Sequence, residues 1–276
     1  MLKQRTITAL VLAPVGIALV LLSPTVVLAL ITGVLTLIAL WEWTRLSGLA
    51  SRPARSGLVA IVAFALAVAW MFRNDPIAWW IVGAGIAWWL VASWWLGNFS
   101  FAAAPTRENA SIKIIAGLFA IIPAWLALIK LHADPPHGPG WALLALMLVW
   151  TADIAAYFAG SRYGKKKLSP RISPNKTYAG VYGALAGGGL LVAIGAFILG
   201  WRGGAWIAMI ALGLVTVLAS IVGDLFESLV KRQASVKDSG TLFPGHGGMF
   251  DRFDSVFAAL PVFAAGKALL DIAFGP

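Results

Sequence analysis

The stretch Ala205-Trp-Ile-Ala-Met-Ile-Ala-Leu-Gly-Leu-Val-Thr-Val-Leu-Ala-Ser-Ile-Val-Gly223 decides the fold class, because it contains no charged side chain. A run of this length crosses the roughly 30 Å hydrocarbon core of a bilayer as an α-helix. Similar runs recur along the whole chain, which is 60% hydrophobic and only 12% charged. Backbone amides in lipid must be hydrogen-bonded within their own segment. The sequence therefore predicts an all-α, polytopic integral membrane helix bundle.

The apolar runs predict about nine transmembrane helices of the kind that span a bilayer. They are expected at 7–23, 25–41, 57–72, 77–96, 112–131, 141–160, 178–200, 205–223 and 253–274. The first two are joined by Ser23-Pro24 and are expected to form a helical hairpin. A cleaved signal peptide is disfavoured, because a second apolar run follows at once and no small-residue cleavage site is evident. The longest polar segments are 161–177 and 224–252.

Most of the 21 lysines and arginines fall in connections on the same side as the N-terminus. The exceptions are Arg73, Lys130, Arg202 and Lys267. The positive-inside rule then places the N-terminus in the cytoplasm. The net charge of +10 needs no nucleic-acid partner, since it follows from this topology and also suits anionic lipid. The absence of cysteine excludes disulfides, thiolate zinc sites and a cysteine nucleophile.

The basic segment 161–177 ends in a pattern that predicts an anion site. Ser173 followed by Pro174 is typical of an N-cap and a first helical position, so Lys176 and Thr177 are expected in the first turn of the next helix. Free amides at a helix start attract phosphate groups, although no P-loop pattern is present. Asp153 lies inside the preceding span, where a carboxylate usually faces a partner or a wet cavity; a structural hydrogen bond between helices is the alternative.

The second polar segment concentrates carboxylates at two helix ends. Asp224, Glu227, Ser228 and Lys231 recur at i, i+3, i+4 and i+7 and share one helix face. Asp251 and Asp254 are expected to lie together where the last span opens.

A glycine-rich loop with Lys237 and His246 separates these two helix ends, and its glycines, Gly247 and Gly248 among them, let backbone amides approach oxyanions. Carboxylates, cations and such a loop suit a Mg²⁺–polyphosphate site. Ordinary salt bridges at a helix junction are the alternative that spacing alone leaves open.

The stretch Ser228-Leu-Val-Lys-Arg-x4-Lys-Asp-Ser-Gly-x2-Phe-Pro-Gly-His-Gly-Gly-Met-x-Asp-Arg-Phe-Asp254 resembles the signature of the phosphatidate cytidylyltransferases, also called CDP-diacylglycerol synthases. Segments 153–160 and 170–177 resemble two further blocks of that family. The chain departs from the pattern at Asn175 and Ala179, where the family often has lysine and glutamate, and at Ile154-Ala155, where it often has threonine and glycine. The strong resemblance covers roughly 151–255.

The resemblance implies attack of the phosphatidate phosphate on the α-phosphorus of CTP, with release of pyrophosphate. It implies Mg²⁺, with a second cation as a further possibility, and a homodimer in the cytoplasmic (inner) membrane with its active site facing the cytoplasm. The expected partners are CTP, phosphatidic acid and the bilayer. The helices within residues 1–140 are expected to form a scaffold for lipid and dimer contacts, and residues 141–276 are expected to form the catalytic region.

Motif position and charge together assign the site residues, and these assignments are predictions. Asp224 and Asp251 are expected to hold metal, with Asp254 as helper. Lys231 and Lys237 complete the expected catalytic set. The expected substrate-binding residues are Asp153, Ser173, Pro174, Lys176, Thr177, Ser228, Arg232, His246, Gly247, Gly248 and Arg252. His246 is expected to shape the loop or touch phosphate rather than bind metal.

Two other function classes remain open from the sequence. A CTP-dependent lipid kinase, or a synthase for a different phospholipid acid, could share nucleotide motifs, but a kinase would transfer a phosphoryl group and no cytidine. A transporter would show midplane charges, broken helices and internal repeats, whereas the charged cluster here lies at the membrane surface. The pattern of the CDP-alcohol phosphotransferases is missing.

Overall fold

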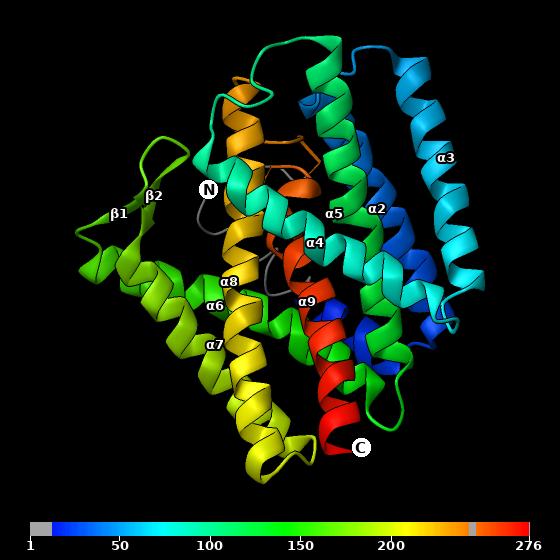
Figure 1. Ribbon diagram of the computed structural model, residues 1–276, viewed down its shortest axis with the longest axis vertical. Coiled ribbons are helices and arrows are strands. Elements are labelled where there is room, and N and C mark those ends of the chain that lie inside the picture. The colour runs from blue at the N-terminus through cyan, green and yellow to red at the C-terminus, as the bar shows by residue number, and fades with distance from the viewer. Residues whose placement is uncertain (1–12, 243–246, 276) are drawn as a thin grey trace.

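The computed structural model describes residues 13–242 and 247–275, and this part of the chain is almost entirely helical (Figure 1). Eight of its helices are long and apolar enough to cross a membrane. They are α2 (Thr25–Leu46), α3 (Arg52–Met71), α4 (Ile77–Gly97), α5 (Arg107–Ala133), α6 (Gly138–Tyr163), α7 (Tyr178–Ile198), α8 (Gly203–Gln233) and α9 (Phe250–Phe274). A shorter apolar helix, Ala13–Leu22, precedes them; the rest of the span predicted at 7–23 lies outside the described residues. The prediction of an all-α polytopic bundle is confirmed.

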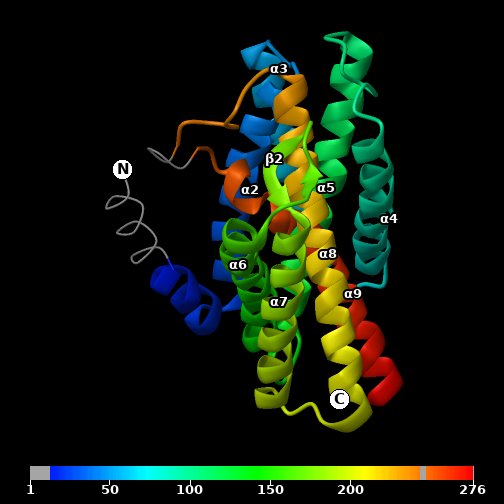
Figure 2. The same ribbon diagram turned by 90° about the vertical axis from the view of Figure 1, so that its left-hand side faces the viewer.

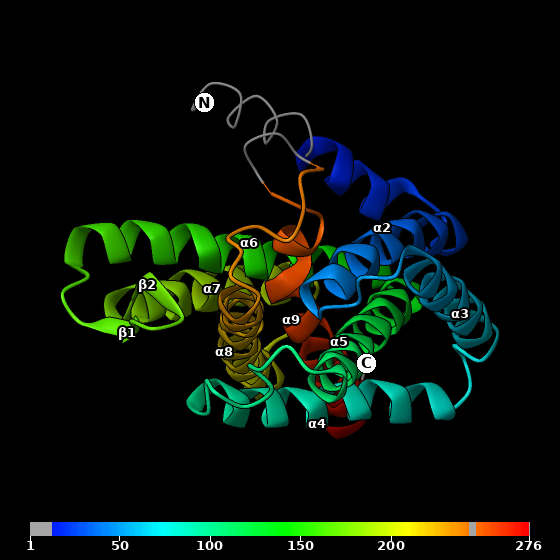
Figure 3. The same cartoon turned by 90° about the horizontal axis from the view of Figure 1, so that it is seen from above.

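Helix α9 occupies the centre of the bundle. It packs against α8, α5, α4, α6 and α2, as the view from above shows (Figure 3). Phe263 is fully buried, and so are Ala258 and Ala259. Elements from both halves of the sequence therefore surround the helix whose first turn carries Asp251.

A glycine brings α8 and α9 together at the level of the carboxylates. A Cβ atom on Gly223 would lie 2.4 Å from the backbone oxygen of Asp254. Small residues are the usual means of close helix approach in membranes, where no hydrophobic force drives helices together. Gly223 therefore sets Asp224, its chain neighbour, beside the start of α9.

Segment 161–177 contains a β-hairpin that the sequence did not predict. Strand β1 (Lys167–Ser169) pairs antiparallel with β2 (Ser173–Thr177), and both lie beside α7 in Figure 2. The predicted helix start at Ser173-Pro174 is wrong, because α7 begins at Tyr178 and Thr177 is its N-cap. Proline fixes a φ that fits a helix start or an edge strand, and the residue before it favours extended backbone. In this protein Ser173 and Pro174 adopt the extended conformation and lie in β2.

The helix ends segregate charge between the two ends of the bundle. The end of α2, the starts of α3 and α5 and the end of α8 lie together at the top of Figure 1, where most of the cations occur. Arg73, Lys130, Arg202 and Lys267 belong to the opposite end, with the ends of α5 and α9. This separation agrees with the predicted topology, while the side that faces the cytoplasm remains a prediction.

Candidate active site

The candidate site begins where the C-terminal part of α8 meets the first turn of α9. Lys231 lies between two carboxylates, with its Nζ 2.7 Å from Glu227 Oε2 and 2.6 Å from Asp251 Oδ1. Glu227 and Lys231 are one helical turn apart on the face that the sequence predicted. Lys231 therefore joins α8 to α9 through a largely buried double ion pair, in which an unpaired charge would be costly.

The loop between α8 and α9 wraps the second oxygen of Asp251. Asp251 Oδ2 accepts hydrogen bonds from the backbone nitrogens of Gly248 (2.7 Å) and Ser239 (2.9 Å), and from Ser239 Oγ (2.9 Å). Gly247 has a positive φ of 80°, and a Cβ there would lie 2.4 Å from the same oxygen. The glycines thus do bring amides to an oxyanion, and that oxyanion is the chain's own carboxylate.

Glu42, on α2, anchors the same loop and was not among the predicted site residues. Its Oε2 accepts a hydrogen bond from the backbone nitrogen of Phe250 at 2.9 Å. The same oxygen lies 2.9 Å from Ser239 Oγ, whose single proton it shares with Asp251 Oδ2. The residue is only 7% exposed. Cβ atoms on Gly240 or Gly248 would lie 2.2 Å from a Glu42 carboxylate oxygen, so both glycines are required by this close approach. The available signal was a carboxylate at the end of an apolar span, in a chain with only 11 acidic residues.

Carboxylates outnumber cations deeper in the site. Asp254 lies close enough to Asp224 and Glu227 for their carboxylates to repel one another. Glu227 is 1% exposed, and within the described residues its Oε1 has no hydrogen-bond partner. Neighbouring buried carboxyls are stabilised by a shared proton or by a cation. Within residues 13–242 and 247–275, however, no group of three or more acidic or histidine side chains is arranged to hold a metal ion.

A cavity of about 750 Å³ opens beside Asp224, between α6, the hairpin, α7 and α8. Lys176 on β2 forms an ion pair with Asp224, and Ser228 Oγ lies 3.4 Å from Asp224 Oδ1. The lining also includes Asp153 and Thr177. Thr177 Oγ1 accepts a hydrogen bond from the Gly180 nitrogen at 3.1 Å, which caps α7 at the cavity wall. The N-cap of this helix is thus four residues later than predicted, and anion binding at the helix start stays a prediction.

The remaining predicted residues occupy more varied positions. Ser173 lines the cavity and lies in β2 with Pro174. Arg232 Nε donates to the carbonyl oxygen of Ile172 at 3.2 Å, so it ties the hairpin to α8. Lys237 and Arg252 are exposed. His246 lies outside the described residues.

Asp224 is paired with Lys176 at the cavity, whereas Asp251 is paired with Lys231 beside the α8–α9 loop. Glu227 and Asp254 lie between them. The structure thus assembles most of the predicted set at one end of the bundle, while the catalytic role of each residue stays a prediction.

The architecture and the site together define a class. Membrane-length helices enclose a lysine-bearing cavity next to a cluster of carboxylates crossed by Lys231, an arrangement suited to a phosphate-bearing substrate. The class is therefore a polytopic membrane enzyme of phosphate-ester chemistry.

The comparisons with known proteins specify the family. Residues 3–269 match the cytidylyltransferase family, and the chain belongs to that family. It is 39% identical over 272 residues to the phosphatidate cytidylyltransferase of Pseudomonas aeruginosa, with 96% of each chain covered. It is 33% identical over 285 residues to that of Haemophilus influenzae (96% of this chain, 98% of the relative) and 32% identical over 268 residues to that of Bacillus subtilis (94% and 95%). The family resemblance that the signature indicated is confirmed.

Proposed function

We propose that this protein transfers CMP from CTP to phosphatidic acid, giving CDP-diacylglycerol and pyrophosphate for phospholipid biosynthesis. The observation that carries the proposal is a cavity of about 750 Å³ with Lys176 and Asp224 in its wall, at the helix α8 that Lys231 links to Asp251 on α9. The relatives named phosphatidate cytidylyltransferase match over nearly their whole length, which supports the same reaction here.

Mg²⁺ is the cofactor that the family resemblance implies, and it is proposed here. Asp224 and Asp251 are the residues proposed to hold it, since Mg²⁺ takes hard oxygen ligands and commonly one or two carboxylates with phosphate and water. When bound, the ion would neutralise triphosphate charge and the charge that develops on pyrophosphate. A second cation is proposed at Glu227, because its Oε1 has no hydrogen-bond partner within the described residues.

The chain's own residues would mainly position the two substrates. A phosphomonoester is already anionic near neutral pH, so its attack on the α-phosphorus needs no strong general base. The main barrier is the approach of two polyanions, which positioned cations and amides lower. Lys176 and the capped start of α7 face the cavity that would take the triphosphate. Lys231 would fix the Asp251 and Glu227 carboxylates through its double ion pair.

We further propose that the site faces the cytoplasm, that the protein resides in the cytoplasmic membrane, and that it forms a homodimer. The charge segregation between the bundle ends supports the orientation. A reporter fused after Phe274, or cysteine labelling from either side of intact vesicles, tests it. Labelling of an α8–α9 loop position from the periplasmic side only would contradict the orientation. Light scattering of the purified protein measures the oligomer.

The reaction is tested with purified full-length protein in detergent, α-labelled CTP, phosphatidic acid and Mg²⁺. Cytidine label in the lipid together with released pyrophosphate is the expected result, and Asp251→Asn is expected to lose at least about a thousandfold in kcat. Glu108→Gln is the control, because Glu108 is an exposed carboxylate outside the signature. Phosphate transfer without cytidine would indicate a kinase, and unimpaired turnover by Asp251→Asn would exclude the assigned carboxylate while leaving the reaction in place.

A further inference from the structure

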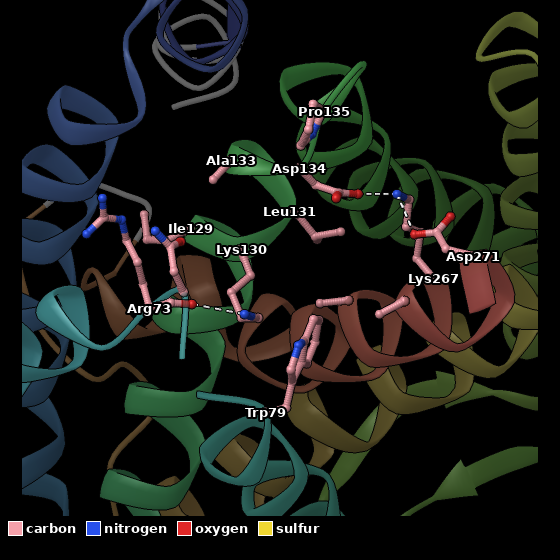
Figure 4. Close-up of a pocket in the computed structure, with 13 residues that line it drawn as sticks. Arg73, Trp79, Ile129, Lys130, Leu131, Ala133, Asp134, Pro135, Lys267 and Asp271 are labelled. Atoms are coloured by element: carbon pink, nitrogen blue, oxygen red, sulfur yellow. Dashed lines mark hydrogen bonds and ion pairs between the residues drawn. The ribbon is translucent and has the colours of Figure 1, made fainter. Parts of the chain in front are cut away.

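A second polar cavity, of about 290 Å³, lies at the end of the bundle opposite the candidate active site (Figure 4). Its walls come from the α3–α4 connection, the first turn of α4, the last turn of α5 and the last turns of α9. Nothing in the proposed transfer reaction uses this cavity, since the carboxylate cluster lies at the other end of α9.

Cations gather at this cavity although they are rare on this side of the protein. Among the residues that the structure describes, only four lysines and arginines, Arg73, Lys130, Arg202 and Lys267, lie outside the strongly basic end. Three of them, all except Arg202, line this one cavity. The positive-inside rule predicts few cations at this end of the bundle. Three cations around one cavity therefore suggest that they have a role there.

One wall presents a lysine with unused hydrogen-bond donors. Lys130 Nζ donates to the carbonyl oxygen of Arg73 at 2.9 Å and lies 4.2 Å from the ring centroid of Trp79. Within residues 13–242 and 247–275, no carboxylate forms an ion pair with it. The Arg73 guanidinium turns away, over the Trp70 ring. An ammonium group has three donors, so Lys130 can still bind an anionic oxygen.

The opposite wall is negative. Lys267 is 6% exposed and is held between Asp134 and Asp271, with 2.8 Å to Asp271 Oδ2. Two carboxylates against one ammonium leave one negative charge, and both carboxylates are partly exposed. Carboxylate oxygens have further lone pairs, so this wall can accept a second cation. The cavity is therefore dipolar, with Lys130 on one side and the aspartates on the other.

Exposed apolar side chains lie on the same helix turns as the cavity lining. Ile77 and Trp80 are in the first turn of α4, and Leu269 and Ile272 are in the last turns of α9; all are exposed, Ile272 to 83%. On a helix bundle of this class such side chains contact lipid, and tryptophan favours the membrane interface. A ligand of this cavity therefore meets charged groups at its head and hydrocarbon beside it.

We propose that this cavity binds the head group of a zwitterionic phospholipid, with the phosphate at Lys130 and the ammonium at Asp134 and Asp271. An anionic lipid without an ammonium group offers no partner to Asp134 and Asp271, and these carboxylates repel its negative charge. The cavity should therefore bind phosphatidic acid and phosphatidylglycerol more weakly. The inference does not depend on the proposed reaction.

The test is a titration of the full-length protein in detergent with phosphatidylethanolamine and with phosphatidylglycerol, followed by native mass spectrometry. The wild type is expected to bind phosphatidylethanolamine roughly tenfold more tightly, which is the effect of one charged hydrogen bond. Lys130→Gln is expected to weaken binding of both lipids, and Asp271→Asn to abolish the preference. Arg202→Gln, which removes an exposed cation at the same end of the bundle, is the matched control and should bind like the wild type.

Equal binding of the two lipids by the wild type would overturn the proposal, and so would unchanged binding by Lys130→Gln. Melting temperatures measured in parallel separate loss of the site from loss of the fold. Lys130→Arg keeps the charge and is expected to retain binding; its failure to bind while well folded would equally refute the assignment.

Discussion

Replacement of Glu42 by alanine is expected to disable the candidate active site without unfolding the bundle. Glu42 is the point at which α2 holds both Ser239 in the loop and the first backbone nitrogen of α9. Its neighbour Trp43 packs independently, with its ring centroid 4.7 Å from that of Phe250 and its Nε1 donating to the Lys113 carbonyl oxygen at 2.8 Å. The helix should therefore stay docked when the carboxylate is removed.

The magnitude follows from the Phe250 bond, because the single Ser239 hydroxyl proton can still be donated to Asp251 when Glu42 is removed. A bond to a charged acceptor is worth about 1.5–3 kcal/mol, and the Phe250 N–H is left buried without a partner. The loop conformation that surrounds Asp251 is thus expected to lose about 1.5–3 kcal/mol. At about 1.4 kcal/mol per factor of ten, this predicts a decrease in kcat of roughly tenfold to a hundredfold. Glu42→Gln keeps an acceptor for Phe250 and should lose only about threefold.

The assay is cytidylyl transfer by each variant in detergent, with thermal unfolding and cation binding measured on the same preparations. The expected order of kcat is wild type, then Glu42→Gln, then Glu42→Ala, with a change in melting temperature too small to explain the losses. Binding of Mn²⁺, followed by its electron paramagnetic resonance signal without substrate, should weaken in the same order. Activity of Glu42→Ala within threefold of wild type would refute the positioning role.

Three further results are expected. Gly248→Ala should lose most activity, because its Cβ would lie 2.2 Å from Glu42 Oε2 and 2.4 Å from Ser239 Oγ; Gly57→Ala, where no atom lies within 4 Å of the added Cβ, is the silent control. Lys176→Gln should raise the KM for CTP about tenfold and lower kcat less; an unchanged KM would remove Lys176 from the nucleotide site. Chelation by EDTA should abolish turnover and added Mg²⁺ should restore it, whereas full activity in EDTA would contradict the metal assignment.

The sequence predicted the features that depend on local patterns. Span length and polarity are enough to locate the membrane helices. The spacing of Asp224, Glu227 and Lys231 placed them on one face of α8, and Asp251 was expected at the opening of the last span; the structure agrees on both. Glycine content also indicated backbone amides near an oxyanion, as found at Gly248.

The features that the sequence missed depend on long-range partners or on a balance between two local conformations. Glu42 meets residues 197 and 208 positions away, and no short pattern encodes such a contact. The Ser173-Pro174 pair fits a helix start or a strand equally well, and pairing with β1 selects the strand. The ion pair of Lys231 with Asp251, 20 positions away, was likewise not predicted.

The contact between α2 and the α8–α9 loop has a consequence for biosynthesis. Glu42 emerges early from the ribosome, whereas its partners emerge close to the last helix, and chains mature from the N-terminus onward. Helix α9 must then enter among helices that are already in the membrane, since it packs against five of them. A product truncated before α9 lacks both the central helix and the Phe250 nitrogen that Glu42 holds. We therefore expect activity to appear only after the last helix has been inserted.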